Sequence, residues 1–434
     1  MTRRTLWLAI LPLVALMAGS TPAAEPPPAV WRGVQPPTLT LAEVQAEIAV
    51  KLERLRALMA AQGLDGVLLT QVRNVWWITA GTVNNQIVLN KDVGAASLLV
   101  LKDGRRFLLC NGAEAGRMMD EGLARLGYQL LEYNWYEANP VQDVRADRLR
   151  QAAGAGRIGA DADFPGTVNV AAALRPLRFS LTDTELRRYR WLGRETAAAV
   201  QEVCRRLRPG MDEFEIEAMT AAALRARGIM PTVLLTAVDE RIAKYRHALP
   251  GGAKLKRYAM VNVVAEKWGM PVAATRFVHF GQLPEDLAKR LRRTAVVNAR
   301  FEAATVPGAK CADIFAACRE WYRAAGYPDE WRKHHQGGAT GYDDREYVIY
   351  PDIAETVQPA QAFAWNPTIT GAKVEDTIVA LPGGAEVVTR AEPWPVITVR
   401  LSGRDWPQPA ILLRDLQTGQ ELPQLETVVD APER

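Results

Sequence analysis

Two segments of this 434-residue chain repeat one pattern, and the repeat restricts the possible folds more than any other feature of the sequence. PGMDEFEIEAMTAAALRARG (residues 209–228) and PGAKCADIFAACREWYRAAG (residues 307–326) each open with Pro-Gly and close with Gly nineteen residues later. Their apolar positions coincide at helical spacing, and each is followed by runs with strand character. A helix followed by strands, present twice, predicts a pseudo-twofold α+β domain with its cavity between the two halves.

The chain before the repeat has a different organisation, in which helical and extended patterns alternate. Apolar residues recur at helical spacing over 41–58, and shorter helical stretches follow near 113–126 and 144–152. Between them lie apolar runs typical of strands, at residues 66–70, 96–101, 105–110 and 157–160. This alternation predicts an α/β domain. A long helix over about residues 183–207 then begins the next unit.

The first residues have the layout of a secretory signal peptide. Arg3 and Arg4 precede an apolar run over residues 6–18, which is short for a bilayer span of about 20 residues, and small residues follow. We therefore expect an exported protein, periplasmic or secreted, that no membrane holds after cleavage; a retained anchor is the alternative. The predicted parts are a signal peptide, a proline-rich leader, an N-terminal domain, a pseudo-twofold domain and a C-terminal extension, over residues 1–24, 25–40, 41–175, 183–393 and 394–434.

Charge, cysteine spacing and the C-terminal pattern add three further expectations. A net charge of +4 and a hydrophobic share of 48% are ordinary for a soluble globular protein and give no reason to expect a nucleic-acid partner. The four cysteines show no CxxC spacing, so buried free thiols are expected. In the C-terminal extension, VITVRL and PAILLR predict strands, and the acidic end after them is expected to be flexible.

The sequence resembles the family of creatinases, prolidases and aminopeptidases P. KLERLRALMAAQGLDGVLLTQVRNVWWITAG (residues 51–81) looks like the opening of that family's N-terminal domain, and residues 183–389 look like its pita-bread catalytic domain. The resemblance implies a hydrolase fold, a homodimer, and a small-molecule or short-peptide ligand. In the family's peptidases, two Asp, one His and two Glu hold two divalent metal ions, which activate a bridging water.

The same motifs place those five ligand positions in this chain, and most of them have changed. Gly269, Thr275 and Arg276 fix the register of NVVAEKWGMPVAATRF, and HHQGGATG and AWNPTI fix the rest. The positions of the two Asp, the His and the two Glu are occupied by Asn262, Ala273, Gly338, Asn366 and Glu375. Glycine and alanine offer no ligand atom, and an amide is a poor substitute for a carboxylate. The sequence therefore predicts no bound metal ion, at His334 and His335 or elsewhere, and no cofactor.

Several polar residues remain as candidates for chemistry. Resemblance to creatinase, which also works without metal, puts a catalytic histidine at His247, with Glu375 as its partner. The residues expected to contact a ligand are Arg276, His334, His335, Arg345, Glu346, Trp365 and Asn366. Each also has a structural interpretation, because histidines and tryptophans pack and Arg345 can simply neutralise Glu375. Asp343-Asp344 is interpreted as a solvated turn.

Three functions are compatible with these residues. The first is metal-independent hydrolysis of a small C–N-bonded substrate that carries a carboxylate, with His247 exchanging protons. The second is a non-catalytic protein that keeps the cavity and binds a small molecule or peptide. The third is an Xaa-Pro aminopeptidase or dipeptidase, against which the substituted ligand positions argue.

Overall fold

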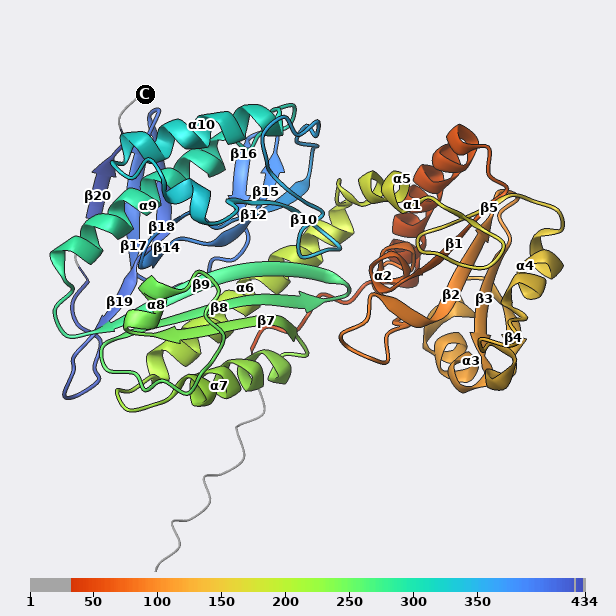
Figure 1. Ribbon diagram of the computed structural model, residues 1–434, viewed down its shortest axis with the longest axis horizontal. Helices are drawn as coiled ribbons and strands as arrows, with labels where there is room; N and C mark the ends of the chain where they lie inside the picture. The colour runs from red at the N-terminus through yellow and green to blue at the C-terminus, as the bar shows by residue number, and fades with distance from the viewer. Residues whose placement is uncertain (1–32, 425–426, 432–434) are drawn as a thin grey trace, which may run out of the picture. The chain divides into compact units, whose positions relative to one another are not determined.

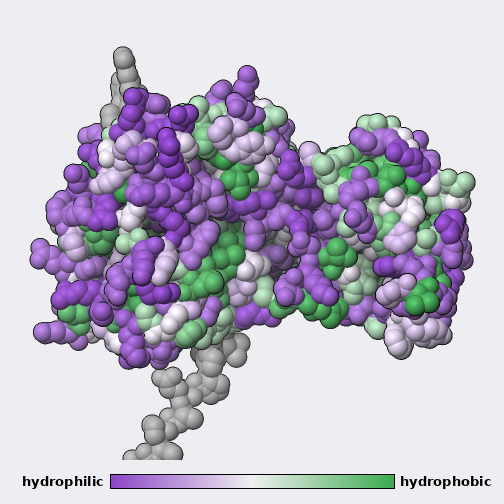
Figure 2. Space-filling model, viewed as in Figure 1, coloured by the Kyte–Doolittle hydropathy of each residue, from purple (hydrophilic) through white to green (hydrophobic). Residues whose placement is uncertain are grey.

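The structure is a computed structural model that describes residues 33–424 and 427–431 (Figure 1). The predicted signal peptide and the first half of the predicted leader, residues 25–32, lie outside these residues. Within the described part of the chain, no helix is long and apolar enough to cross a membrane. The face drawn in Figure 2 carries mostly hydrophilic residues with hydrophobic ones scattered among them, as is usual for a protein surface.

The N-terminal part is the α/β domain that the alternating pattern predicts. Its six-stranded sheet has the order β4-β3-β2-β1-β5-β6. The strands are β1 (Gly66–Gln71), β2 (Val93–Leu101), β3 (Arg106–Asn111), β4 (Tyr128–Tyr133), β5 (Ile158–Ala160) and β6 (Val168–Asn169). The helices are α1 (Leu41–Gln62), α2 (Val72–Ile78), α3 (Gly112–Met118), α4 (Arg145–Ala153) and α5 (Ala171–Leu174). A capping box at Thr40 begins α1, and Gly63, at φ 62°, ends it.

The second domain consists of two halves, each with two long helices and an antiparallel sheet. The first half contains α6 (Asp183–Arg206), α7 (Glu213–Ala226), β7 (Met230–Val238), α8 (Glu240–Lys244), β8 (Tyr258–Lys267) and β9 (Met270–Phe280). The second contains α9 (Glu285–Ala304), α10 (Cys311–Ala324), β10 (Gly337–Thr340), β11 (Tyr347–Val348), β12 (Gln361–Trp365), β13 (Thr368–Ile369), β14 (Ala372–Lys373), β15 (Asp376–Leu381) and β16 (Gly384–Val387). In Figure 1, α6 and α7 lie beside the β7–β9 sheet, and α9 and α10 lie beside the other sheet.

The predicted repeat is confirmed by matching geometry at both of its ends. Helices α7 and α10 each have 14 residues. Gly228, at φ 65°, and Gly326, at φ 86°, follow their C-termini in the left-handed region that glycine adopts without strain. At their N-termini, Asp212 and Lys310 each form an isolated antiparallel bridge, to Lys254 and Thr356 respectively. The local sequence thus builds the same helix frame twice.

The C-terminal extension differs from the expectation of a flexible end. VITVRL forms β17 (Val396–Leu401) as predicted, followed by β18 (Arg404–Pro409) and β19 (Ile411–Arg414). β19 pairs in parallel with β9 and so completes the sheet of the first half. Within the acidic end, β20 (Thr427–Asp430) pairs in parallel with β17. The exposed edge of β17 offers unpaired backbone groups, and this pairing satisfies them.

Buried ion pairs tie the N-terminal helix to the second domain. The Lys51 Nζ atom lies 2.6 Å from a Glu47 carboxylate oxygen and 2.7 Å from one of Glu185, and all three side chains are buried. The guanidinium of Arg188 donates to both oxygens of Glu47. Because each charge has a partner, the network avoids the cost of an isolated buried ion. The four cysteines are free and buried, as predicted.

We predict that Glu302 in α9 makes stability depend on pH. Burial raises the pKa of Glu302 to about 8 from its ordinary value of 4.5, although Gln408 and Asn298 donate to it. Between these two values the unfolded chain is ionised and the folded chain is neutral, so stability falls as pH rises. Glu302→Gln removes that loss. Its gain in unfolding free energy over wild type should therefore be larger at pH 8 than at pH 5, by about 1 kcal/mol or more.

Urea unfolding at the two pH values measures this difference. Glu285→Gln, an exposed carboxylate on the same helix, serves as the control and should give the same small effect at both. An equal effect of Glu302→Gln at pH 5 and pH 8 would contradict the assignment.

Candidate functional site

His247 lies in the loop after α8, and its position is fixed by the residue before it. The Arg246 guanidinium pairs with the Glu330 carboxylate and donates to the Thr370 hydroxyl at 3.1 Å. Glu330 also accepts from the Thr370 backbone N–H at 3.0 Å and from Lys333 at 2.7 Å. One carboxylate therefore holds together the loop of His247, the turn at Thr370 and the segment that leads to His334.

His334 and His335 follow a 3-10 turn (Glu330–Lys333) and precede β10. Gln336 shapes this segment: its side-chain amide donates to the His334 carbonyl at 2.7 Å and accepts from the Tyr322 hydroxyl at 2.7 Å. Gln336 is buried, so these hydrogen bonds fix the backbone from the inside. The two imidazoles are thereby turned toward the loop of His247.

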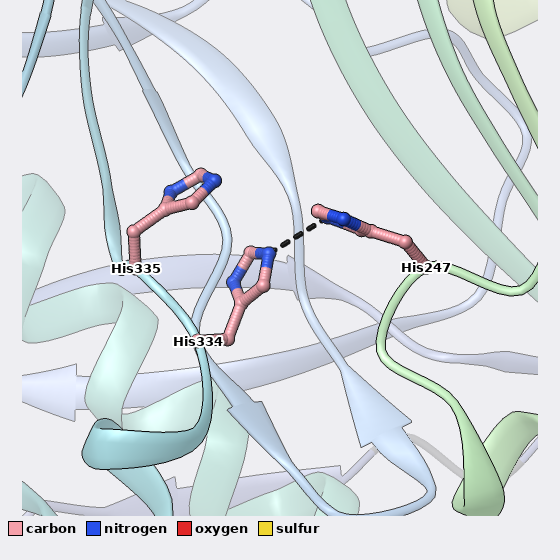
Figure 3. A group of neighbouring side chains, drawn as sticks. All are labelled: His247, His334 and His335. Atoms are coloured by element: carbon pink, nitrogen blue, oxygen red, sulfur yellow. Dashed lines mark hydrogen bonds between the residues drawn. The ribbon is translucent and has the colours of Figure 1, made fainter.

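The three imidazoles meet, as Figure 3 shows. The Nε2 atoms of His247 and His334 are 2.8 Å apart, within hydrogen-bond distance. The ring centroids of His334 and His335 are 4.1 Å apart, and those of His247 and His335 are 6.4 Å apart. We call this group the histidine trio. The sequence analysis predicted a catalytic role for His247 and ligand contacts for His334 and His335. In the structure all three side chains lie together.

Burial and nearby cations keep the trio neutral at neutral pH. Burial, followed by the neighbouring histidine and Lys373, lowers the pKa of His334 to about 3. Burial, followed by Arg345, lowers the pKa of His335 to about 4. Burial also lowers the pKa of His247, with Lys373 as the next cause. At pH 7 every member therefore carries a nitrogen lone pair.

Glu375, the one family ligand that is retained, is surrounded by cations and donors. The Lys373 Nζ atom lies 2.8 Å from its Oε2, and an Arg345 Nη atom lies 3.6 Å from its Oε1. The Thr275 hydroxyl donates to Oε2 at 2.6 Å, and the Asn262 amide donates to the same oxygen. These partners, Lys373 first, hold the pKa of Glu375 below its ordinary value although burial raises it. The carboxylate is ionised and its charge is compensated.

The other positions do not fit a dinuclear metal centre. A Cβ atom on Gly338 would lie 2.0 Å from the Tyr347 carbonyl oxygen and 2.8 Å from the Val348 Cα. The neighbouring strand β11 therefore fills the space that a histidine side chain would need. Ala273 packs in a small apolar cluster with Val264 and Ala364, where a carboxylate would lose its hydration. The surroundings of Gly338 and Ala273 are therefore those of a packed core and leave no room for the ligands of two metal ions.

The two asparagines behave differently from each other. The Asn262 side-chain amide donates to Glu375 and to the Thr275 hydroxyl at 2.7 Å, so it acts as a donor where the family has an acceptor. Asn366 is 3% exposed, and its Oδ1 atom has no hydrogen-bond partner among the described residues. A buried acceptor without a partner is costly, and a ligand that donates a hydrogen bond would satisfy it.

Three residues expected to contact a ligand are buried and have partners within the protein. The Arg276 guanidinium pairs with Asp376 at 2.9 Å and donates to the Thr389 carbonyl at 2.8 Å. Trp365 stacks on aromatic rings in the core, and its indole N–H donates to Thr305 at 3.0 Å. Glu346 accepts from Arg178 with both oxygens in a buried pair. The sequence motifs did not reveal these partners.

Lys373 is the site residue that sequence reasoning missed. It lies two positions before Glu375, a spacing at which extended side chains share a face, and this pattern was the available signal. Asp343-Asp344 also proves to be more than a solvated turn. Asp343 pairs with Arg73, and Asp344 lines a cleft of about 380 Å³ together with Trp76, Met230 and Glu266. Burial and then Asp344 raise the pKa of Glu266 to about 7.

Comparison with known proteins identifies the class. Residues 51–190 match the creatinase/prolidase N-terminal domain, and residues 187–381 match metallopeptidase family M24. The uncharacterized peptidase YqhT of Bacillus subtilis (strain 168) is 22% identical over 369 residues, covering 79% of this chain and 98% of its own. Xaa-Pro dipeptidase from Bacillus anthracis has a TM-score of 0.64 at 19% identity, covering 79% of this chain and 98% of that one.

A further structure, dipeptidase PepE from Mycobacterium ulcerans, has a TM-score of 0.65 at 18% identity and covers 89% of this chain and 99% of that one. The chain belongs to the creatinase, prolidase and M24 metallopeptidase family, whose members share the N-terminal domain and the pita-bread domain described above. Its class is that of peptidase-like and prolidase-like hydrolases. The resemblance noted from the motifs is therefore confirmed.

We predict that the position of the family's histidine cannot simply be restored. Gly338→Ala should lower stability by about 1–3 kcal/mol, because the new methyl group meets backbone atoms of β11 that can move only together with the strand. Gly338→His should be at least as destabilising. Thermal unfolding of the purified variants measures this, with Gly383→Ala as the control, since no atom lies within 4 Å of its added Cβ. A Gly338→Ala variant that melts with wild type would show that the position is open.

Proposed function

We propose that this protein hydrolyses a small C–N-bonded substrate carrying a carboxylate, and that it does so without the family's dinuclear metal centre. The observation that carries the proposal is the arrangement around Glu375. Two side-chain cations, Lys373 and Arg345, flank this single carboxylate, next to three neutral imidazoles. Positive charge thus exceeds negative charge by one among these groups, and an anionic ligand would balance it.

The cations are placed to accept a carboxylate. The side chains of Lys373 and Arg345 are 8% and 17% exposed, so little water competes with a ligand for them. Arg345 uses one Nη atom on the Asp344 carbonyl at 2.6 Å, and its buried Nε has no partner among the described residues. A guanidinium with an open N–H is suited to a planar carboxylate.

The histidine trio supplies the proton transfer that hydrolysis needs. Water adds to the carbonyl carbon of the C–N bond and gives one proton to His247; the bond then breaks, and His247 returns the proton to the leaving nitrogen. His247 is the exposed member of the contacting pair and is therefore the one placed to meet substrate. His334 holds its ring through the contact between the Nε2 atoms.

The second candidate is a binding protein that keeps these ligand-binding groups but not the chemistry. One observation favours it: the hydrogen-bond partner of His247 is another imidazole, and no carboxylate among the described residues is hydrogen-bonded to it. Catalytic histidines are commonly oriented by such a carboxylate. The third candidate, an Xaa-Pro peptidase, is suggested by the named relatives, and the closed position at Gly338 argues against it.

We predict that the pair of cations determines ligand affinity. A thermal-shift screen of amino acids, X-Pro dipeptides and amidino carboxylates would first find a ligand. Lys373→Met should then weaken binding about 10- to 100-fold, since a charge-assisted hydrogen bond contributes roughly 1.5–3 kcal/mol, and Lys373→Arg should restore most of it. Arg292→Gln, a change at a more exposed cation on α9, serves as the control. Equal affinity of wild type and Lys373→Met for every carboxylate found would remove this contact from the proposal.

A second prediction separates enzyme from binding protein. With the ligand found above, His247→Ala should lower turnover by about 10²- to 10⁴-fold while affinity changes much less. The measurement is turnover and affinity together, on wild type and variant, with circular dichroism to check the fold. Unchanged turnover would remove His247 from the mechanism. A tight ligand that wild type never converts would support the binding protein instead.

Export and homodimer formation belong to the same proposal. The supporting observations are the basic and apolar layout of residues 1–24 and the family membership. N-terminal sequencing of the mature protein and light scattering of the purified chain test the two points separately.

A further inference from the structure

Three of the four histidines in this 434-residue chain meet at one place. His247 and His334 come from loops 87 residues apart in sequence, and His335 adds its ring from the second loop. The fourth, His279, lies in β9, where its Nδ1 atom donates to the Gly281 carbonyl oxygen 3.3 Å away. Because histidine is so scarce in this chain, three of them at one place indicate a role for the imidazole nitrogens there.

The geometry of the histidine trio is close to that of a metal site. One nitrogen from each ring can be chosen so that all three lie within 4.8 Å of one another. A tetrahedral ion with metal–nitrogen bonds of about 2.0–2.1 Å needs its nitrogens roughly 3.3 Å apart. The observed pair at 2.8 Å would open slightly, and the third ring would move inward by a side-chain rotation.

We infer that the histidine trio binds one divalent transition metal ion of the zinc, cobalt or nickel type, through three imidazoles with a fourth position left open. This site is separate from the family's dinuclear centre, because it uses none of the five positions that form that centre. The residues at four of those five positions are Asn262, Ala273, Gly338 and Asn366.

The chemistry of the rings selects the ion. Neutral imidazole suits zinc, cobalt, nickel and copper, whereas magnesium and calcium prefer oxygen ligands. Lys373 and Arg345 oppose any cation here, and Glu375 offsets one of these two charges. The open fourth position therefore favours an anion such as hydroxide or a carboxylate, which would balance the remaining positive charge.

The surrounding hydrogen bonds already place the ligands. The Glu330 carboxylate joins the two loops through Arg246, and Gln336 holds the His334 backbone. The Gly337 N–H donates to the His335 Nδ1 at 3.2 Å, a long bond that a ring rotation toward the ion would break. The His334 Nδ1 is buried without a hydrogen-bond partner among the described residues, so the protein offers it no competing contact. These contacts position the two loops that carry the imidazoles.

The metal site goes beyond the proposed function and has a consequence for it. An ion would occupy the lone pair with which His247 accepts a proton. Added zinc should therefore stop the proposed hydrolysis, which is the opposite of the role that metals have in the family's two-metal peptidases. Binding of the ion itself does not depend on whether the protein turns over a substrate.

The experiment uses the mature protein without a histidine tag, dialysed against a chelator and titrated with Zn²⁺ in competition with a chromophoric chelator. Titration with Co²⁺ then reports geometry through its visible absorption. We expect one equivalent of either ion per chain, bound with a Kd in the micromolar range or tighter, and a cobalt spectrum of tetrahedral type. His334→Asn and His335→Asn should each weaken zinc binding at least 10-fold, and His279→Asn should bind like wild type. Circular dichroism confirms that each variant is folded.

Wild type that binds neither ion below about 100 µM would overturn the inference. Zinc binding unchanged by His334→Asn and His335→Asn, or weakened equally by His279→Asn, would overturn it as well. The carboxylate affinity of metal-free wild type and Lys373→Met is measured separately. If zinc does not bind but Lys373→Met still weakens carboxylate binding, only the metal site is refuted. If zinc binds but Lys373→Met leaves carboxylate affinity unchanged, only the proposed function is refuted.

Discussion

A buried carboxylate must have positive charge beside it, and Glu375 shows how this protein meets that requirement. In the family's peptidases two metal ions supply the charge, whereas here an ammonium and a guanidinium lie within 4 Å of the same carboxylate. Unlike an ion, these side chains belong to the chain, so the charge is present as soon as the domain folds. The retained glutamate is thus explained by its new partners.

The surroundings of the other ligand positions also lack space or charge for a metal-binding carboxylate or imidazole. Asn262 donates where an aspartate would accept, so it adds a donor to Glu375 in place of a second negative charge. Backbone of β11 occupies the space beside Gly338, and an apolar cluster surrounds Ala273. Asn262 and Asn366 carry no charge, and Gly338 and Ala273 offer no side-chain ligand atom. Reversing one of these substitutions alone would leave a buried carboxylate unpaired or a side chain without space.

The sequence predicts the fold well because the relevant signals are local. Helical spacing and the glycines that end α7 and α10 are properties of short segments, and the repeat follows from comparing them. The family's ligand positions can be located in the sequence only because the motifs around them resemble those of the family. Partners cannot be located in this way, because Arg276, Trp365 and Glu346 find theirs 60 to 168 residues away. The role of Glu330, which joins two loops, has no sequence signature for the same reason.

The histidine trio illustrates the limit of arguing residue by residue. Taken singly, each histidine has an ordinary packing interpretation, and the family pattern has no role for the adjacent pair of His334 and His335 as one unit. Taken together they are most of the histidines of the chain, and they lie close enough to Lys373 and Arg345 for these cations to lower their pKa values. A packing role would not by itself bring three neutral imidazoles together from two loops, since apolar side chains fill space without unsatisfied nitrogens. The concentration of lone pairs and cations at one point is therefore best explained by a ligand that uses both.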